Sequence, residues 1–214
     1  MDSIFDPGLV LCLPLWQLDG GSFMSRDAYG HICNVTGALW RPQGRYFDGV
    51  NDFVELPASA SLNVAGANQA FTFEVWVYFI AASPDTYSIL LGKDTLFLGR
   101  KNSNGKGTFS IWHGAGDCIY LESNQALSNG QWYHLVGTRD AGMDCRIFVN
   151  GLLDCTPTNY AKAPAGGERP KYLGSLNGTN YQTNGYIGQA RVYSRALTPQ
   201  EIQHNYLATK WRYH

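Results

Sequence analysis

Residues 71–78 alternate between two kinds of side chain, a pattern that a β-strand produces and a helix does not. One set is apolar and the other is mixed. The apolar set is Phe71, Phe73, Val75 and Val77, and the intervening set is Thr72, Glu74, Trp76 and Tyr78. Successive side chains of a strand point to opposite faces of the sheet, so a period of two predicts a strand with two differently used faces. We expect the apolar set to face a core and Trp76 and Tyr78 to lie on an outer surface.

Strand-length runs of this kind recur along the whole chain, between Gly and Asn residues that favour turns. They include residues 8–16, 52–56, 108–112, 132–137, 145–149 and 188–193. With 14% aromatic and only 15% charged residues, the composition suits short strands and argues against helical bundles and disorder. Many short strands at such intervals predict an all-β sandwich. No linker or internal repeat divides the chain, so residues 1–214 are expected to form one domain.

One helix is predicted, near the C-terminal end. Thr198 has the residue type of an N-cap, Pro199 suits the first helical position, and Glu201 can close a capping box. Ile202 and Tyr206 then lie on one stripe of the helix, which we expect to pack against the sandwich.

The clearest hairpin turns at Asn150-Gly151. A two-residue loop leaves Cys145 and Cys155 one step out of register, whereas a three-residue loop places them opposite each other and would allow a disulfide. The five cysteines are an odd number without a C-x-x-C pair, which favours buried free thiols over a disulfide framework. The register, and with it the bridge, stays open at this point.

Five segments carry motifs of a known family, in the family's order. They are Gly8–Trp16 with Asp19 and the turn at Asp27–His31, Tyr46–Leu56 with its F-D-G-x-x-D-F-V core, Phe71–Val77, Leu127–Gly151, and Gly185–Leu197. Together they span essentially the whole chain, which resembles the laminin-G-like, pentraxin-like branch of the concanavalin A-like lectin/glucanase superfamily. The resemblance implies a jelly roll of two stacked, curved antiparallel sheets. It does not fix a function, because the superfamily contains lectins, adhesion modules, glycosidases and structural domains.

The sequence argues against catalysis. Glycosidases of this fold usually carry an E-x-D-x-x-E strand, whose spacing places two carboxylates on one face. The chain has no E-x-D or E-x-E, and Glu74, the one plausible face carboxylate, is followed two residues later by Trp76. We therefore expect Glu74 to be a solvated residue of the sheet face and the protein not to be an enzyme. No G-x-S-x-G is present, and the histidines do not pair, so His134 is expected to be structural.

Calcium is the one cofactor that the resemblance brings into question. Related domains often bind calcium near the F-D-G-x-x-D segment, where Asp48, Asn51 and Asp52 would supply oxygen ligands. Relatives often add two acidic residues on the late strand, but Gly188 and Gln189 stand there in this chain. The aspartates then have an alternative role as turn residues that accept backbone amides.

Aromatic side chains are the candidates for ligand binding, since their faces stack on the C–H surfaces of sugars. Most will fill the core, but some are placed on outer faces or in loops. The candidates are Trp76, Tyr78, Trp112, Tyr120 and Tyr160. The longest irregular stretch, residues 156–170, follows the hairpin and is a further place to expect function.

The net charge and the terminal sequences limit the classes of partner and the location that we expect. A formal net charge of −1 gives no bulk attraction to nucleic acid or to an anionic membrane surface. Asp2, Asp6 and Pro7 do not suit a signal peptide, and no stretch is long and apolar enough to span a bilayer. We expect a binding module for a glycan or a surface, displayed on a larger assembly such as a virus particle or extracellular fibre, or otherwise cytoplasmic. The alternative is a structural or decoration protein of a capsid or fibre without sugar binding, and a glycosidase is the minor alternative. The binding module and the structural protein could each form homo-oligomers.

Overall fold

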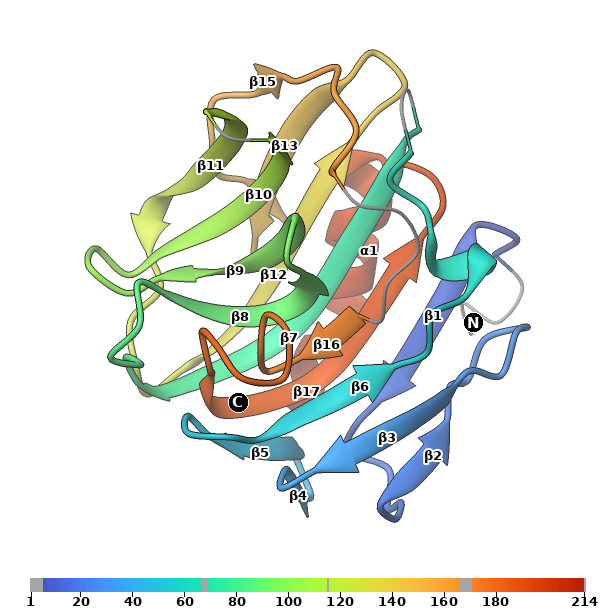
Figure 1. The fold of residues 1–214 in the computed structure, drawn as a ribbon, viewed down its shortest axis with the longest axis vertical. Coiled ribbons are helices and arrows are strands. Elements are labelled where there is room, and N and C mark those ends of the chain that lie inside the picture. Colours follow the sequence, from blue (N-terminus) through green and yellow to red (C-terminus); the bar gives the residue numbers. More distant parts are fainter. Residues whose placement is uncertain (1–5, 67–68, 115, 166–170, 214) are drawn as a thin grey trace.

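The computed structural model describes residues 6–66, 69–114, 116–165 and 171–213. These residues form two antiparallel sheets packed face to face and one α-helix (Figure 1). This is the predicted all-β jelly-roll sandwich with a short C-terminal helix.

The sheet farther from the viewer in Figure 1 has nine strands and is called the back sheet. In order across the sheet, its strands are β14 (Leu152–Leu153), β13 (Asp144–Val149), β12 (Trp132–Arg139), β7 (Phe71–Ala81), β17 (Asn184–Tyr193), β5 (Gly44–Asp48) and β4 (Leu39–Arg41), with β1 (Leu9–Pro14) paired to β17 and β15 (Thr158–Asn159) paired to β13. The strands that start and end the chain therefore meet in one sheet.

The sheet nearer the viewer has eight strands and is called the front sheet. In order, its strands are β11 (Asp117–Ala126), β10 (Lys106–Gly114), β9 (Leu96–Lys101), β8 (Tyr87–Lys93), β16 (Lys171–Leu173), β6 (Phe53–Leu56), β3 (Ile32–Thr36) and β2 (Ser22–Met24). Its first four strands follow one another along the chain and form a meander, whose outer face positions the candidate site.

The core lies between the two sheets, where the apolar set of β7 was expected to point. Phe71, Phe73, Val75 and Val77 are all fully buried there. From the front sheet, Phe109 places its ring centroid 5.8 Å from that of Phe71. The period of two in the sequence thus identified the inward face of the strand correctly.

Helix α1 (Pro199–Thr209) covers the outer face of the back sheet, on the far side in Figure 1. It begins as predicted: the Thr198 side chain accepts a hydrogen bond from Glu201 N, and the Glu201 carboxylate accepts one from Thr198 N. Ile202 is fully buried beneath it. Among the described residues, no helix has the length and apolar character needed to cross a lipid bilayer.

The expectation that Trp76 lies exposed is wrong, because the C-terminal segment covers its ring. Trp76 retains only 2% exposure. Its ring stacks on Tyr206 and Tyr213, at centroid distances of 5.7 and 4.4 Å, and its Nε1 donates to Thr209 Oγ1 at 2.8 Å. The outward face of β7 is therefore a second buried layer between sheet and helix.

Glu74 lies in the same layer and is not the solvated residue that was expected. It is 2% exposed, and its Oε1 contacts His134 Nε2 at 3.0 Å and Arg191 Nη1 at 3.2 Å. Its Oε2 accepts a hydrogen bond from Asn205 of the helix. Burial raises the pKa of Glu74, but the charge of Arg191 and the bonds from His134 and Asn205 outweigh burial and lower the pKa to about 2. Glu74 is thus an ionised structural anchor for the helix.

Of the two hairpin registers that the sequence left open after β13, the structure has the one with a two-residue loop. Val149 pairs with Leu152, and Asn150 and Gly151 have φ values of +52° and +81°. Cys145 consequently lies opposite Thr158 rather than Cys155, and both cysteines are free thiols. Burial raises the pKa of both, which keeps them protonated.

Candidate functional site

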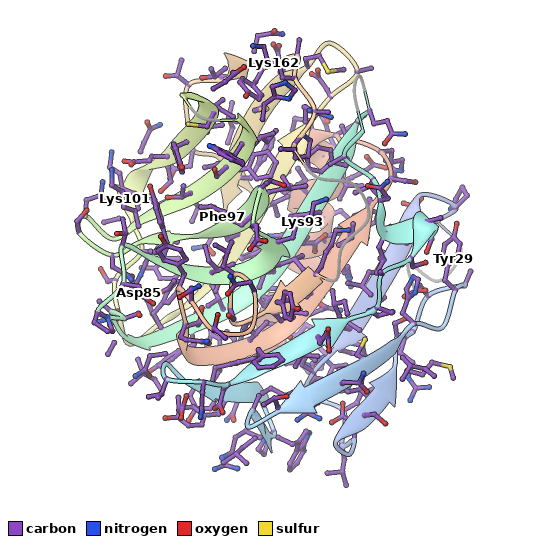
Figure 2. The ribbon with its side chains drawn as sticks, in the orientation of Figure 1. Tyr29, Asp85, Lys93, Phe97, Lys101 and Lys162 are labelled. Atoms are coloured by element: carbon purple, nitrogen blue, oxygen red, sulfur yellow. The ribbon has the colours of Figure 1, made fainter. Side chains whose placement is uncertain are left out.

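A hollow of about 220 Å³ opens on the outer face of the front sheet. Its walls are mostly aromatic and come from β8 to β11 and from the loop after β16. The lining residues are Tyr87, Ile89, Asp94, Phe97, Ser110, Trp112, Tyr120, Leu176 and Tyr181. We call it the front-face hollow. Figure 2 shows Phe97 near the middle of this face of the molecule, with Lys93 beside it.

Strand alternation and cross-strand register bring these side chains together. In β10, Phe109 and Ile111 enter the core, so Ser110 and Trp112 point outward. Ser110 pairs with Phe97 of β9 on one side and with Tyr120 of β11 on the other. Three adjacent strands therefore present one row of side chains across the sheet.

Tyr87 is the centre of the aromatic cluster. Its ring lies parallel to that of Tyr120, at a centroid distance of 5.9 Å and an interplanar angle of 7°. Phe97 and Tyr181 contact it at steeper angles, with centroids 5.4 and 6.1 Å away. Tyr120, which is 46% exposed, leaves much of its ring open to solvent.

Tyr181 is held in an unusual backbone conformation at the rim of the hollow. Its φ is +55°, in the left-handed region that bulky side chains rarely adopt. Its carbonyl accepts a hydrogen bond from Ile89 N at 3.1 Å, which fixes the loop against β8. Strain of this kind often marks a functional site, and here it directs an aromatic ring toward Tyr87.

Tyr87 and Tyr120 keep their protons in the hollow. Burial raises the pKa of Tyr87, and the charge of Lys101 offsets this only in part. The pKa of Tyr120 is raised by burial and then by Cys118 and Tyr87. Both phenols are therefore hydrogen-bond donors at neutral pH, and Asp94, which also lines the hollow, carries acceptor oxygens.

Two of the five aromatic residues predicted as ligand contacts, Trp112 and Tyr120, line the front-face hollow. Trp76 is buried under the helix, and Tyr78 packs among Trp132 and Tyr186 in the back sheet. The structure thus separates these two from the hollow. The specific contacts with a ligand stay a prediction for all five.

Tyr160 lies outside the hollow but anchors the segment next to it. Its hydroxyl donates to Asp117, whose carboxylate also pairs with Lys162. Burial and the neighbouring Asp117 raise the pKa of Tyr160 to about 12. Farther along the same segment, Ala165 N donates to Trp112 O at 2.9 Å, so this loop borders the hollow at Trp112.

Tyr87 and Phe97 were not predicted from the sequence. Phe97 lies between Leu96 and Leu98, so its segment is apolar without interruption and shows no period of two. Tyr87 is the first residue of its strand, so no preceding strand residues show an alternation of side chains that would predict which face it lies on. The predicted strand at residues 108–112 was the usable signal, because its partners across the sheet include Phe97 and Tyr120.

Asp48, Asn51 and Asp52 form a compact turn. Asp48 Oδ1 accepts hydrogen bonds from Val50 N and Asn51 N, and Asp52 Oδ2 accepts one from Asp48 N. Calcium takes about six to eight oxygen ligands. These carboxylates are engaged in bonding the turn itself, as in the alternative that the sequence left open. The described residues contain no group of three or more His, Cys, Asp or Glu side chains placed to hold a metal ion. Calcium therefore stays a prediction, and no role is derived for it.

A larger hollow of about 530 Å³ lies between α1 and the back sheet, but its charges are engaged with one another. Arg195 pairs with Asp6 and Glu201, and Arg191 pairs with Glu74. This arrangement is that of a structural ion-pair network.

The sequence profile of the concanavalin A-like lectin/glucanases superfamily matches residues 48–203. The chain belongs to this superfamily. The resemblance seen in the motifs is thereby confirmed, and the family label fits the two stacked sheets. Among curated proteins, no sequence matches the chain.

Solved structures with this fold are distant in sequence. Domain 4 of AbnA, a GH43 extracellular arabinanase from Geobacillus stearothermophilus solved with arabinotriose, is 18% identical with a TM-score of 0.69, over 92% of this chain and 97% of that one. Trypanosoma rangeli sialidase in complex with sialic acid is 20% identical with a TM-score of 0.67, over 99% of this chain and 34% of the sialidase. The binding domain of botulinum neurotoxin serotype G is 15% identical with a TM-score of 0.72, over 94% and 51%. The chain thus spans about a third of the sialidase and half of the toxin domain, and these likenesses concern the fold.

Proposed function

We propose that the protein is a non-catalytic glycan-binding module and that the front-face hollow is its binding site. The observation that carries the proposal is the cluster of aromatic rings, partly open to solvent, on an outer sheet face where core packing does not require them. Clustered, solvent-facing aromatic residues of this kind usually mark an interaction site.

The chemistry of the hollow suits a sugar. The rings of Tyr120 and Trp112 offer apolar faces on which the C–H face of a sugar ring can stack. Polar groups at the same place, the tyrosine hydroxyls and Asp94, can exchange hydrogen bonds with sugar hydroxyls. A few convergent polar groups in an otherwise apolar hollow are the usual composition of a small-ligand site.

Similar structures support this assignment at the level of fold. The arabinanase domain was solved with arabinotriose, and the sialidase with sialic acid. The sialidase is about three times longer than the matched region, so its hydrolytic activity is not transferred to this chain.

The acidic residues support binding without catalysis. Glycoside hydrolysis usually requires two carboxyl groups about 5–9.5 Å apart across the scissile bond. Asp94 is the only acidic residue among the described residues that line the hollow. Glu74 lies on the other sheet, committed to Arg191 and His134. We therefore expect a bound glycan to survive prolonged incubation with the protein.

A glycan array tests the proposal. Wild-type protein should bind a restricted set of glycans, and Trp112→Ala should lose most of this signal, because removing a stacking ring costs roughly 1–3 kcal/mol. Trp211→Ala is the matched control, since Trp211 is 63% exposed on the helical side of the molecule. An array without bound glycan, or equal signals for Trp112→Ala and wild type, would contradict the proposal.

A further inference from the structure

A second hollow, of about 470 Å³, lies beside β1 and the 3₁₀-helix η2 (Ala60–Leu62). Its polar lining comes from Tyr29, Ser61, Asn63, Gln69 and Ser194. We call it the Tyr29 hollow. Figure 2 shows Tyr29 at the edge of the molecule, away from Phe97 and the front-face hollow.

Tyr29 is a fixed aromatic surface that faces solvent. Its side chain is 53% exposed, although one face stacks on the buried His31 ring, at a centroid distance of 5.7 Å and an angle of 11°. The Asp27 carboxylate accepts hydrogen bonds from the backbone of Tyr29 and of Cys12, which ties this turn to β1. The ring is therefore held in place by bonds and packing that do not bury it.

The polar side chains that line the Tyr29 hollow are amides and hydroxyls. Asn63 and Gln69 are exposed, and Gln69 Oε1 accepts a hydrogen bond from Gly66 N at 2.8 Å. Ser61 Oγ lies 3.1 Å from Nε2 of His31, the residue whose ring stacks on Tyr29, so the Ser61 hydroxyl is hydrogen-bonded to the residue that supports the Tyr29 ring. No residue with a formally charged side chain is among the described residues that line the hollow.

We propose that the Tyr29 hollow is a second sugar-contacting site, for one or two neutral sugar rings. An aromatic face beside amide and hydroxyl groups matches the C–H face and hydroxyl groups of a neutral sugar, and an uncharged lining offers nothing to an anion. The volume falls within the roughly 300–1,000 Å³ of small-molecule sites. The proposal goes beyond the front-face hollow and rests on different residues.

Two separate sites would give the protein avidity for a surface with repeated sugars. A second contact on the same surface forms at a high effective concentration, so each site can be weak on its own.

Amide NMR spectra of the labelled protein, titrated with arabinotriose, maltotriose and lactose, test the proposal. At least one of these should shift the amides of Gly30, Ser61 and Ser194 in a saturable way. Tyr29→Ala should weaken this titration about tenfold, the loss of one stacking contact of roughly 1.4 kcal/mol. Tyr29→Phe keeps the ring and should bind nearly as wild type, which controls for the local fold.

The same spectra separate the two sites. The amides of Ser110 and Tyr120 report on the front-face hollow, and Trp112→Ala should alter that titration while leaving the one around Tyr29 unchanged. If none of the three saccharides shifts the amides around Tyr29, or if Tyr29→Ala titrates like wild type, the second site is overturned, whatever the front-face hollow does.

Discussion

The buried charges under helix α1 show how single residues set the stability of this sandwich. Glu74 is deprotonated among Arg191, His134 and Asn205, with almost no access to water. Removing one partner of a buried ion pair leaves the other charge uncompensated, which typically costs about 3–5 kcal/mol. The cluster therefore holds the helix to the sheet only as long as it is complete.

We expect Glu74→Gln to lower the free energy of unfolding by about 3–5 kcal/mol, because Arg191 loses its counter-charge. Replacing both residues, as Glu74→Gln with Arg191→Met, should recover a large part of the loss. Urea unfolding of the three proteins measures this. A double variant no more stable than Glu74→Gln would show that the ion pair is not the origin of the effect.

The low pKa of Glu74 also predicts a pH dependence. The folded state keeps the carboxylate ionised down to about pH 2, while the pKa of a glutamate in the unfolded chain has its ordinary value of 4.5. The resulting stability, roughly 3 kcal/mol, is present above about pH 4.5 and is lost as the pH falls toward 2. Unfolding measured between about pH 6 and about pH 2.5 should therefore depend less steeply on pH in the Glu74→Gln, Arg191→Met variant than in wild type. Equal slopes would contradict the shifted pKa.

At the scale of elements, helix α1 shows what a sequence predicts well. The helix begins with hydrogen bonds between Thr198 and Glu201, which are only three residues apart. Because these bonds are local, the sequence predicts where the helix begins. The inward set of β7 followed from alternation for the same reason. The outward set did not, because Trp76 and Glu74 are covered by residues more than 120 positions later in the chain. A contact between residues so far apart in the chain cannot be predicted from the local sequence pattern of β7.

Packing should outweigh capping in holding α1. Thr198→Ala removes the cap and should cost about 1 kcal/mol, whereas Ile202→Ala leaves a cavity under a fully buried side chain and should cost about 2–4 kcal/mol. Leu207→Ala, at a half-exposed position of the same helix, is the control and should have a small effect. Thermal or urea unfolding ranks the three variants, and a cost for Leu207→Ala as large as that for Ile202→Ala would contradict this packing.

At the scale of the whole molecule, the outer faces of the two sheets differ. The outer face of the back sheet is covered by α1, while the outer face of the front sheet carries the aromatic hollow. The sequence predicted the sandwich and two walls of the hollow, Trp112 and Tyr120. It could not show that Tyr87 and Phe97 join them, because cross-strand register and the loop at Tyr181 decide which exposed rings become neighbours.

The central claim is that a glycan occupies the front-face hollow without being cleaved. A crystal structure of the protein with the glycan that binds best on the array tests it most directly. We predict an intact sugar ring stacked on Tyr120 or Trp112, with its hydroxyls in reach of Asp94. A glycan found only elsewhere on the molecule, or a hydrolysed product in the hollow, would contradict the account.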